Sequence, residues 1–391
     1  MEKEKKRQGT EDDSSEELTS FLTDFIDPWY ASLKDPSRSQ QQTLENLLVG
    51  YAQTDYGKAH GAGRIATVKE FQSAFPTANY GSFQPYFEKV KSGNYTALLS
   101  EPVSGWVMTR GTTGTPKVIP TTETHLAQIL FVGARAIINY ALKKDQQILR
   151  RNVLNLNFPS EVFTMNTSSG EQRYGYSSGT YAKLHPSLDA ASLVPRQEDI
   201  DSLGGGISKS DWERRFELIY GAAKQSDVGC VMGVTPVILA FARYLKHRHG
   251  VLPRQVWEMS ALFCTSVAKI HSKYAPELRY YYGNAPIVEM YTATEGVFAQ
   301  QLDKNPYLVP NYDTYLFEVR TGRGIKLLHE LPASEWGSLI VSSTLFPRYE
   351  IGDLIESIGR GYYRVFGRAK TLTVLEHLFY NLLAGRRVVA R

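Results

Sequence analysis

The stretch that decides the fold is a glycine- and threonine-rich loop, which reads Thr109-Arg110-Gly111-Thr112-Thr113-Gly114-Thr115-Pro116-Lys117. Its two glycines, Gly111 and Gly114, let the backbone turn tightly and expose N–H groups. Threonine hydroxyls and the positive charges of Arg110 and Lys117 add donors, which is what a loop needs to hold a triphosphate. It is not a Walker A loop, because Pro116 occupies the glycine position. A plain surface loop is the alternative that composition alone leaves open.

A second polar stretch surrounds a short apolar segment, and it reads Gly283-Asn284-Ala285-Pro286, then Ile287 to Met290, then Tyr291-Thr292-Ala293-Thr294-Glu295-Gly296. The pattern predicts a strand between two loops. Residues 291–295 contain an aromatic ring, hydroxyl groups and a carboxylate. The ring is suited to stack on a purine, the hydroxyl to meet a phosphate, and the carboxylate to ligate Mg²⁺. A strand that ends in a capped turn is the structural alternative.

A third stretch reads Arg348-Tyr349-Glu350-Ile351-Gly352-Asp353, and it is followed by Tyr363-Arg364-Val365-Phe366-Gly367-Arg368-Ala369-Lys370. An aspartate after glycine at a strand end can accept hydrogen bonds from ribose hydroxyls, and Arg368 can add a charge-assisted bond to the same nucleotide. Taken singly, an aspartate such as Asp353 is more often only a turn residue.

In this order the three stretches resemble the motifs of the adenylate-forming superfamily, which includes acyl-CoA synthetases and luciferase. The first is similar to T-S-G-T-T-G-x-P-K, with Arg110 in place of the common serine. Residues 291–295 are similar to Y-G-x-T-E, and residues 349–353 to Y-R-x-G-D, with Glu350 where arginine is common. Glu350 therefore departs from the pattern, which puts any role for that side chain in doubt.

A narrower resemblance, to the auxin-responsive GH3 family of acyl acid amido synthetases, runs from about residue 17 to 370. It rests on residues 54–61, 86–93 and 275–295. The plant phosphate loop usually reads S-S-G-T-S, so this chain looks closer to microbial members. The resemblance implies an α/β fold: a large luciferase-like N-terminal domain with sheet layers and a β-rich subdomain.

The resemblance also implies a reaction and a set of site residues. A small carboxylic acid is activated with ATP and Mg²⁺ as an acyl-adenylate, and an amino acid then forms the amide. We expect Thr294, Glu295 and Lys117 to be catalytic, with Glu295 as the metal ligand. The expected nucleotide contacts are Thr109, Arg110, Gly111, Thr112, Thr113, Gly114, Gly283, Ala285, Tyr291, Asp353 and Arg368. The alternatives are an acyl-CoA ligase and a non-catalytic nucleotide or acyl binder.

Composition narrows the possible partners. The chain has 391 residues, 42% of them hydrophobic, and a formal net charge of +4. This charge is too weak to favour nucleic acid. No run of about 18 apolar residues occurs, so no membrane-spanning helix and no membrane partner are expected. Cys230 and Cys264 fit no metal spacing, and buried free thiols in a reducing cytoplasm are expected.

Sequence patterns also predict the domain organisation. Residues 1–16 are charged and predict a disordered tail, the adenylate-forming domain spans 17–368, and residues 369–391 form a hinge and the remnant of a C-terminal domain. We expect a helix from about Glu16, interrupted or kinked at Asp27-Pro28, and a second helix over residues 40–51. Further helices are expected from about Thr124, and from about Thr235 to just before Gly250. Strands dominate after about residue 284. The irregular stretch 155–181 and the helix around 234–245 are the candidates for the acyl pocket.

Overall fold

The computed structural model describes residues 2–109, 116–184 and 192–383. Most strands of this part join one twelve-stranded sheet, in the order β13-β12-β14-β15-β16-β11-β10-β9-β8-β7-β3-β6. The sheet changes character at β9, with parallel pairing on one side and antiparallel pairing on the other. The predicted α/β core followed by a β-rich section is therefore confirmed.

The parallel half of the sheet consists of β3 (Asn152–Leu154), β6 (Leu193–Val194), β7 (Val228–Val234), β8 (Ala261–Thr265) and β9 (Ile287–Ala293). Helices cover both of its faces, so its strands are continuously apolar rather than alternating, and every residue of β8 is buried. Parallel strands point the same way, so Thr265 and Ala293 lie at the same edge of the sheet. This edge carries the candidate site described below, as is usual in open α/β sheets.

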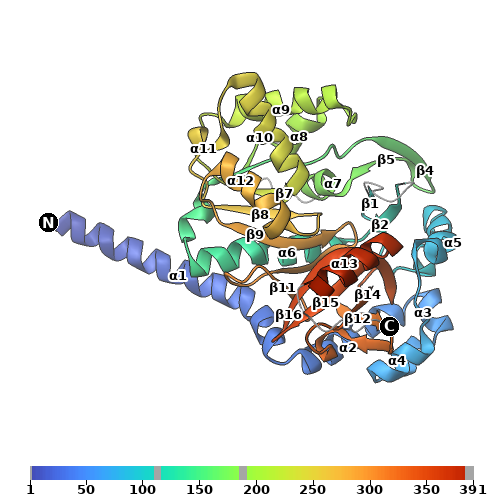
Figure 1. Cartoon of the computed structure of the whole chain (residues 1–391). Coiled ribbons are helices and arrows are strands. Elements are labelled where there is room, and N and C mark those ends of the chain that lie inside the picture. The colour runs from blue at the N-terminus through green and yellow to red at the C-terminus, as the bar shows by residue number, and fades with distance from the viewer. Residues whose placement is uncertain (1, 110–115, 185–191, 384–391) are drawn as a thin grey trace.

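Four helices flank the parallel half on two sides. Helices α9 (Lys209–Ala223), α10 (Thr235–His249) and α12 (Ala275–Tyr282) cover one face, and α6 (Glu123–Lys143) covers the other (Figure 1). The short helices α8 (Gln197–Asp201) and α11 (Pro253–Val256) lie beside the first group. Gly250 caps α10 in the left-handed conformation, as predicted. Helix α6 begins at Glu123, with Thr122 as its N-cap, one residue before the expected start at about Thr124.

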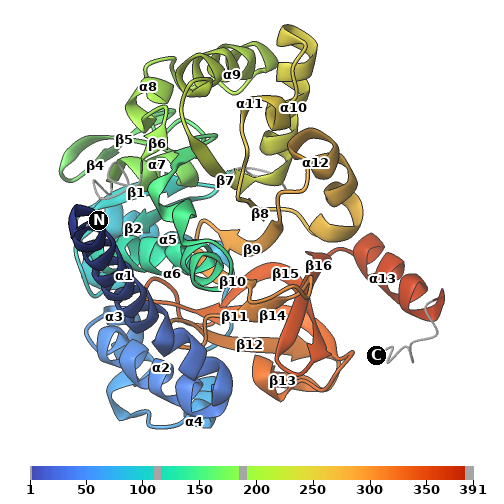
Figure 2. The ribbon, with the colours of Figure 1, turned by 90° about the vertical axis from the view of Figure 1, so that its left-hand side faces the viewer.

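The antiparallel half follows in the chain and lies below the parallel half in Figure 2. Its strands are β10 (Gly296–Gln301), β11 (Leu308–Pro310), β12 (Leu316–Thr321), β13 (Gly324–Leu327), β14 (Trp336–Ser342), β15 (Tyr349–Gly359) and β16 (Tyr362–Arg368). One large apolar cluster joins these strands to the N-terminal helices. Asp353 lies inside β15 and not at a strand end, which corrects the sequence-based placement.

A second, four-stranded sheet has the order β2-β1-β5-β4. It consists of β1 (Gly105–Met108), β2 (Val118–Thr121), β4 (Phe163–Thr167) and β5 (Gly170–Tyr176), and α7 (Ser177–Leu184) follows β5. Strands β1 and β2 pair antiparallel, so the phosphate-loop motif joins their neighbouring ends. The backbone of Thr109 donates to the Lys117 carbonyl at 2.8 Å, which closes the base of that loop.

The N-terminal helices are α1 (Glu2–Lys34), α2 (Pro36–Tyr51), α3 (Asp55–Ala59), α4 (Val68–Ala74) and α5 (Tyr80–Lys91). The structure differs from the predicted tail over residues 1–16, because α1 begins at Glu2 and projects from the body (Figure 1). Residues 2–8 are mostly lysine, arginine and glutamate, which favour helix, and the helix continues through Gly9, which does not. An interruption or a kink was predicted at Pro28, but the helix is not interrupted there. Asp24, whose carbonyl Pro28 leaves without its helical donor, is exposed to water.

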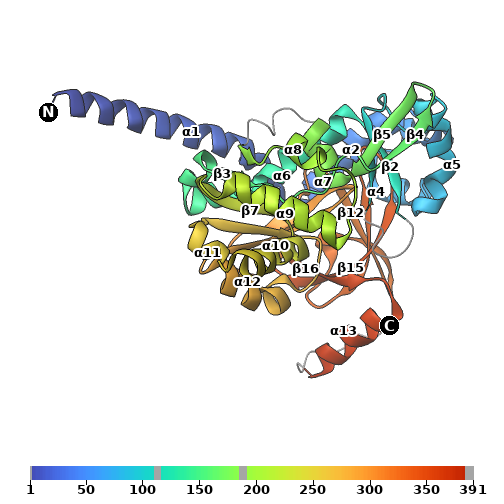
Figure 3. The ribbon, with the colours of Figure 1, turned by 90° about the horizontal axis from the view of Figure 1, so that it is seen from above.

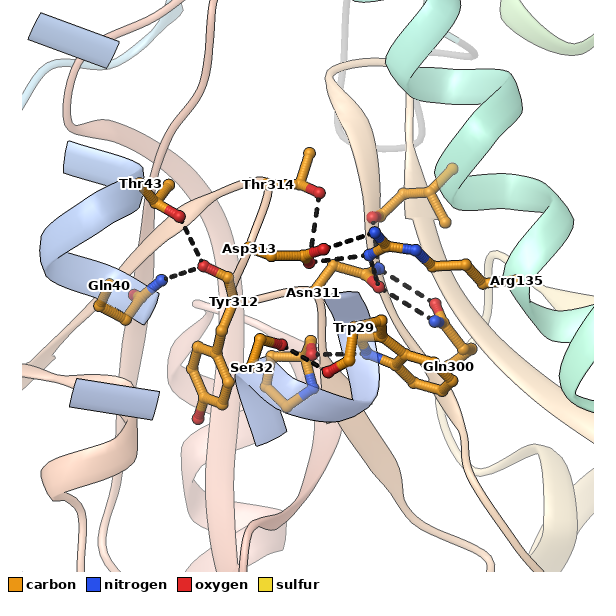
Figure 4. A network of polar contacts seen from close by, with 12 residues as sticks. Trp29, Ser32, Gln40, Thr43, Arg135, Gln300, Asn311, Tyr312, Asp313 and Thr314 are labelled. Carbon is orange, nitrogen blue, oxygen red and sulfur yellow. Dashed lines mark hydrogen bonds and ion pairs between the residues drawn. The ribbon is translucent and has the colours of Figure 1, made fainter. Parts of the chain in front are cut away.

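A buried polar network anchors α6 and α1 to the turn after β11 (Figure 4). Arg135 of α6 is 1% exposed and pairs with Asp313 at 2.6 Å, and it also donates to Asn311 Oδ1 at 2.9 Å. The indole of Trp29 donates to the Pro310 carbonyl at 3.0 Å. Because each charge in this network has a charged or hydrogen-bonding partner, the network fixes the position of α6 against the antiparallel half.

Helix α13 (Thr371–Leu383) follows β16 and projects from the body in Figures 2 and 3. In the described part of the chain, α6 is also the one helix whose length and composition suffice to cross a membrane. Half of its most apolar stretch is buried inside the protein, and core helices of soluble proteins share this length and composition.

Candidate nucleotide and acyl site

A cavity of about 660 Å³ opens at the edge of the sheet where β7, β8 and β9 end. This volume lies within the range of small-molecule sites, about 300–1,000 Å³. The predicted residues that line it are Thr109, Lys117, Tyr291, Thr294, Glu295, Asp353 and Arg368. All three sequence motifs therefore reach one cavity.

Lys117 lies at the polar end of the cavity. Its ammonium group donates to the Tyr349 hydroxyl at 3.1 Å and lies 5.5 Å from the centre of the Tyr80 ring. The Thr109 hydroxyl accepts a hydrogen bond from the backbone of Lys117 at 3.0 Å. These contacts fix both ends of the phosphate-loop motif. The predicted residues Arg110, Gly111, Thr112, Thr113 and Gly114 lie outside the described residues.

Glu295 lies beside this lysine at the end of the second motif. It is 6% exposed, and burial raises the pKa of its carboxyl group, while the nearby Lys117 charge and a hydrogen bond from Tyr349 lower it. The turn that carries Glu295 is held from behind. Tyr181 of α7 donates to the Thr294 carbonyl at 2.5 Å, and Nε2 of His125 lies 3.3 Å from the Glu295 carbonyl.

His125 itself is fully buried, and burial lowers its pKa to about 4, so the ring is neutral near pH 7. A neutral ring whose Nδ1 accepts from Thr121, at 2.8 Å, has Nε2 free to donate to the Glu295 carbonyl. The pair of His125 and Tyr181 was missed by sequence reasoning. Nothing in the local pattern distinguishes them from ordinary core residues.

Asp353 and Arg368 face each other across β15 and β16, because their backbones are register partners. The guanidinium group lies 3.1 Å from the carboxylate, and the Tyr291 hydroxyl donates to the same carboxylate at 2.6 Å. Burial raises the pKa of Asp353, whereas Arg368, Tyr291 and Lys117 lower it. A carboxylate held in this way presents acceptor oxygens, as the sequence prediction for the ribose requires.

Two predicted nucleotide contacts lie away from the cavity. Gly283 caps the C-terminus of α12 with φ of 74°, and Ala285 packs against the core on the α12 side. Both precede β9, so they lie at the opposite end of that strand from Thr294. The segment that takes their expected place is Thr265–Ala268, which follows the parallel strand β8 and lines the cavity. The sequence prediction chose the loop before β9. Because β8 and β9 are parallel, the loop that lies at the same edge of the sheet as Thr294 is the one after β8.

The other end of the cavity is apolar and lies against α6, which was not a predicted site element. Its lining there includes Ile129, Leu130, Gly133, Ala134, Ile137, Met290 and Val297. The stretch 155–181 also contributes, through Leu156, Phe158 and Tyr176 among others, but of the helix around 234–245 only Val234 reaches the cavity. Gly133 and Ala134 are adjacent small residues in an apolar helix. This pair was the feature of the sequence that could have indicated space for a ligand beside α6.

The sequence profile of the GH3 family N-terminal domain matches residues 27–239, more than half of the chain. The chain belongs to the GH3 family. Its similarity to curated relatives is local. A jasmonoyl–L-amino acid synthetase GH3.5 of Oryza sativa subsp. japonica is 28% identical over 89 residues, which are 22% of this chain and 15% of that protein. An indole-3-acetic acid-amido synthetase GH3.2 of Arabidopsis thaliana is 26% identical over 110 residues, 27% of this chain and 20% of that protein. The matches thus cover at most a fifth of these relatives.

Solved structures support the fold of this GH3 chain. AtGH3.15 acyl acid amido synthetase in complex with 2,4-DB matches with a TM-score of 0.73 at 14% identity, over 90% of this chain and 71% of that one. An open conformation of 2-hydroxyisobutyryl-CoA ligase matches with a TM-score of 0.57 at 14% identity, over 87% and 74%. The predicted adenylate-forming fold is confirmed.

Proposed function

We propose that this GH3 chain activates a small carboxylic acid with ATP, forming an acyl-adenylate and pyrophosphate. The observation that carries the proposal is a single cavity with two unlike ends. Lys117, Glu295, Asp353 and Arg368 gather at one end, and the apolar face of α6 forms the other. A nucleoside triphosphate would bind at the charged end, and the hydrocarbon part of an acid would bind at the apolar end.

Different polar residues would bind different parts of the nucleotide. Lys117 is placed to bind the phosphates, and the carboxylate of Asp353 to accept from ribose hydroxyls, with Arg368 beside it. Thr294 lines the same cavity and would face the α-phosphate. Arg110 and Thr112–Gly114 are proposed as further phosphate donors from their sequence alone.

Mg²⁺ fits this donor set only together with the substrate. No group of three or more His, Cys, Asp or Glu side chains placed to hold a metal occurs among the described residues. Mg²⁺ commonly uses one or two carboxylates, with phosphate oxygens and water completing the shell. Glu295 offers one such carboxylate beside the proposed phosphate position. When bound there, the ion would offset the charge that builds on the phosphates.

The first step is displacement at phosphorus. A carboxylate oxygen of the acid attacks the α-phosphorus, a new P–O bond forms, and the bond to the bridging oxygen of pyrophosphate breaks. Pyrophosphate leaves with that electron pair. Lys117 stabilises the charge on the departing phosphates, and Tyr181 and His125 keep Thr294 and Glu295 in place during the step.

The second step that we propose is amide formation. The amino nitrogen of an amino acid attacks the acyl carbon, the C–O bond to AMP breaks, and the nitrogen loses a proton. Thiolysis by CoA is the second candidate, supported by the fold shared with 2-hydroxyisobutyryl-CoA ligase. Because the α6 end of the cavity is apolar, we propose an aryl or alkyl acid as substrate.

Pyrophosphate release with a panel of aryl and alkyl acids tests the first step. We expect Lys117→Met to abolish most of it, and Lys91→Met, at the C-terminal end of α5, to leave it unchanged. Acid-dependent release that is equal in both variants would refute the role of Lys117. No release with any acid would favour a non-catalytic binder. Consumption of the adenylate by amino acids or hydroxylamine, but not CoA, separates amide synthesis from CoA ligation.

A further inference from the structure

The hydroxyl group of Tyr349 lies between the two charged side chains that the proposed function assigns to the phosphates and to Mg²⁺. Nζ of Lys117 donates to this hydroxyl at 3.1 Å, and the hydroxyl donates in turn to the carboxylate of Glu295. The structure describes both charged residues, and they form no direct ion pair with each other. The hydroxyl group therefore links the two charges, and the proposed chemistry has so far given it no task.

The core of the protein fixes the position of this hydroxyl. Tyr349 is the first residue of β15 and is 2% exposed. Its ring packs against Phe346 and Phe83, with centroid distances of 5.1 and 6.2 Å. The next backbone N–H, that of Glu350, donates to the Ala78 carbonyl at 2.7 Å. The ring is thus held by its neighbours and by the backbone, so the hydroxyl is a rigid point between two side chains that are longer and more flexible.

The protonation of Tyr349 sets the direction of both hydrogen bonds. Burial and the charge of Glu295 raise the pKa of Tyr349, so the hydroxyl keeps its proton near pH 7. A phenolic hydroxyl has one proton to donate and an oxygen that accepts. The ammonium group can only donate and the ionised carboxylate can only accept, so the hydroxyl accepts from Lys117 and donates to Glu295.

Without this hydroxyl, the two charges would be drawn into contact. Opposite unit charges a few ångströms apart attract strongly in a partly buried site. Lysine carries its charge on a flexible four-carbon chain, so the ammonium group is able to move the short distance to the carboxylate. In such a direct pair Lys117 would be occupied by Glu295, and Glu295 by Lys117. A triphosphate with Mg²⁺ would have to separate them before either could bind it.

We propose that Tyr349 is a positioning residue whose hydroxyl keeps Lys117 and Glu295 apart, so that the ammonium group stays available to the phosphates and the carboxylate to Mg²⁺. This inference rests on the proposed ATP-dependent function. When the nucleotide binds, a phosphate oxygen replaces the hydroxyl as the acceptor for Lys117, and the hydroxyl keeps its hydrogen bond to Glu295.

The substitution Tyr349→Phe removes the hydroxyl and little else. Nζ of Lys117 lies 5.5 Å from the centre of the Tyr80 ring and 5.7 Å from the centre of the Tyr349 ring. Both aromatic faces attract the ammonium group, and phenylalanine keeps that attraction. The packing against Phe83 and Phe346 is also kept.

The test compares ATP binding, measured by calorimetry in excess Mg²⁺ and without any acid, in the wild type, Tyr349→Phe, Glu295→Gln and the double variant. We expect Tyr349→Phe to weaken ATP binding by about tenfold or more, because two charges in contact must first be separated. In the Glu295→Gln background Lys117 has no charge to pair with. The same substitution should therefore change the affinity by less than about twofold there.

A different role for the hydroxyl, such as direct contact with ATP or general support of the loop, predicts the same loss in both backgrounds. Tyr312→Phe is the matched control, because Tyr312 is 1% exposed, does not line the cavity, and donates its hydroxyl proton to Tyr363 at 3.1 Å. Its ATP affinity should equal that of the wild type, and circular dichroism checks that each variant is folded.

Equal losses in the two backgrounds, or an unchanged ATP affinity in Tyr349→Phe, would overturn the inference and leave the proposed function standing. A wild type that binds no ATP in the presence of Mg²⁺ would overturn the proposed function, and the inference with it.

Discussion

Replacing Arg348 by methionine should destabilise the whole fold, because this arginine is the counter-charge of Glu318, a carboxylate with no exposed surface. The side chains of Arg348 and Glu318 are 4% and 0% exposed. The guanidinium group makes two parallel hydrogen bonds to the carboxylate, at 2.9 and 2.8 Å. It also donates to the carbonyls of Gln72 and Phe75, at 2.8 and 2.6 Å.

The size of the effect follows from what is left behind. In Arg348→Met, Glu318 keeps one donor, the amide of Gln72 at 2.9 Å, but loses its counter-charge in a dry environment. Breaking one side of such a pair costs about 3–5 kcal/mol, mainly because a buried charge remains uncompensated. Two carbonyls also lose their donor, which acts in the same direction. We therefore expect the free energy of unfolding to fall by at least about 3 kcal/mol.

Urea unfolding followed by tryptophan fluorescence measures this change. The double variant Arg348→Met with Glu318→Met should be more stable than Arg348→Met alone, since it removes the orphaned charge. Arg173→Met is the control. Arg173 pairs with Glu161 at the surface, where such pairs contribute little, so the unfolding midpoint should not move. A loss below about 1 kcal/mol in Arg348→Met, or a double variant less stable than the single one, would refute the reasoning.

Three further predictions concern the site and the core. Glu295→Gln should require more Mg²⁺ for pyrophosphate release, since it loses the charge that favours the ion; an unchanged Mg²⁺ titration would argue against the role. Gly133→Leu should lower kcat/KM for the bulkiest acids by about tenfold and spare the smallest, because it fills the cavity beside α6; equal losses for all acids would contradict this. Burial raises the pKa of Cys230 and Cys264 to about 12, so at pH 8 iodoacetamide should label the folded chain far more slowly than the unfolded one, and equal rates would count against it.

Much of the fold could be predicted from local pattern. Apolar periodicity located α2 and the buried part of α1, and the short apolar run between two polar loops located β9. These elements form because their apolar residues must be removed from water, and the spacing of those residues along the chain indicates a helix or a strand. An interruption or a kink was predicted at Pro28, and the interruption does not occur, because proline is tolerated where water can take the place of the lost donor.

The candidate site was predicted less completely, because its residues come from segments that lie far apart in the sequence. The motifs named Lys117, Thr294, Glu295, Asp353 and Arg368, and all of them reach the cavity. Gly283 and Ala285 were placed there wrongly, because composition does not say which end of a strand meets a ligand. Strand direction does, and it depends on the pairing of β9 with β8.

The sequence by itself therefore determined the family, the chemistry of the polar motifs and the class of fold, since these depend on residue type and short spacing. The tertiary structure alone decided the contacts that join them. Lys117 meets Tyr349 across 232 positions of chain, and Tyr181 meets Thr294 across 113. The apolar wall from α6 has the same origin. Such contacts are fixed by how the two halves of the sheet and their helices pack, and no local periodicity encodes that packing.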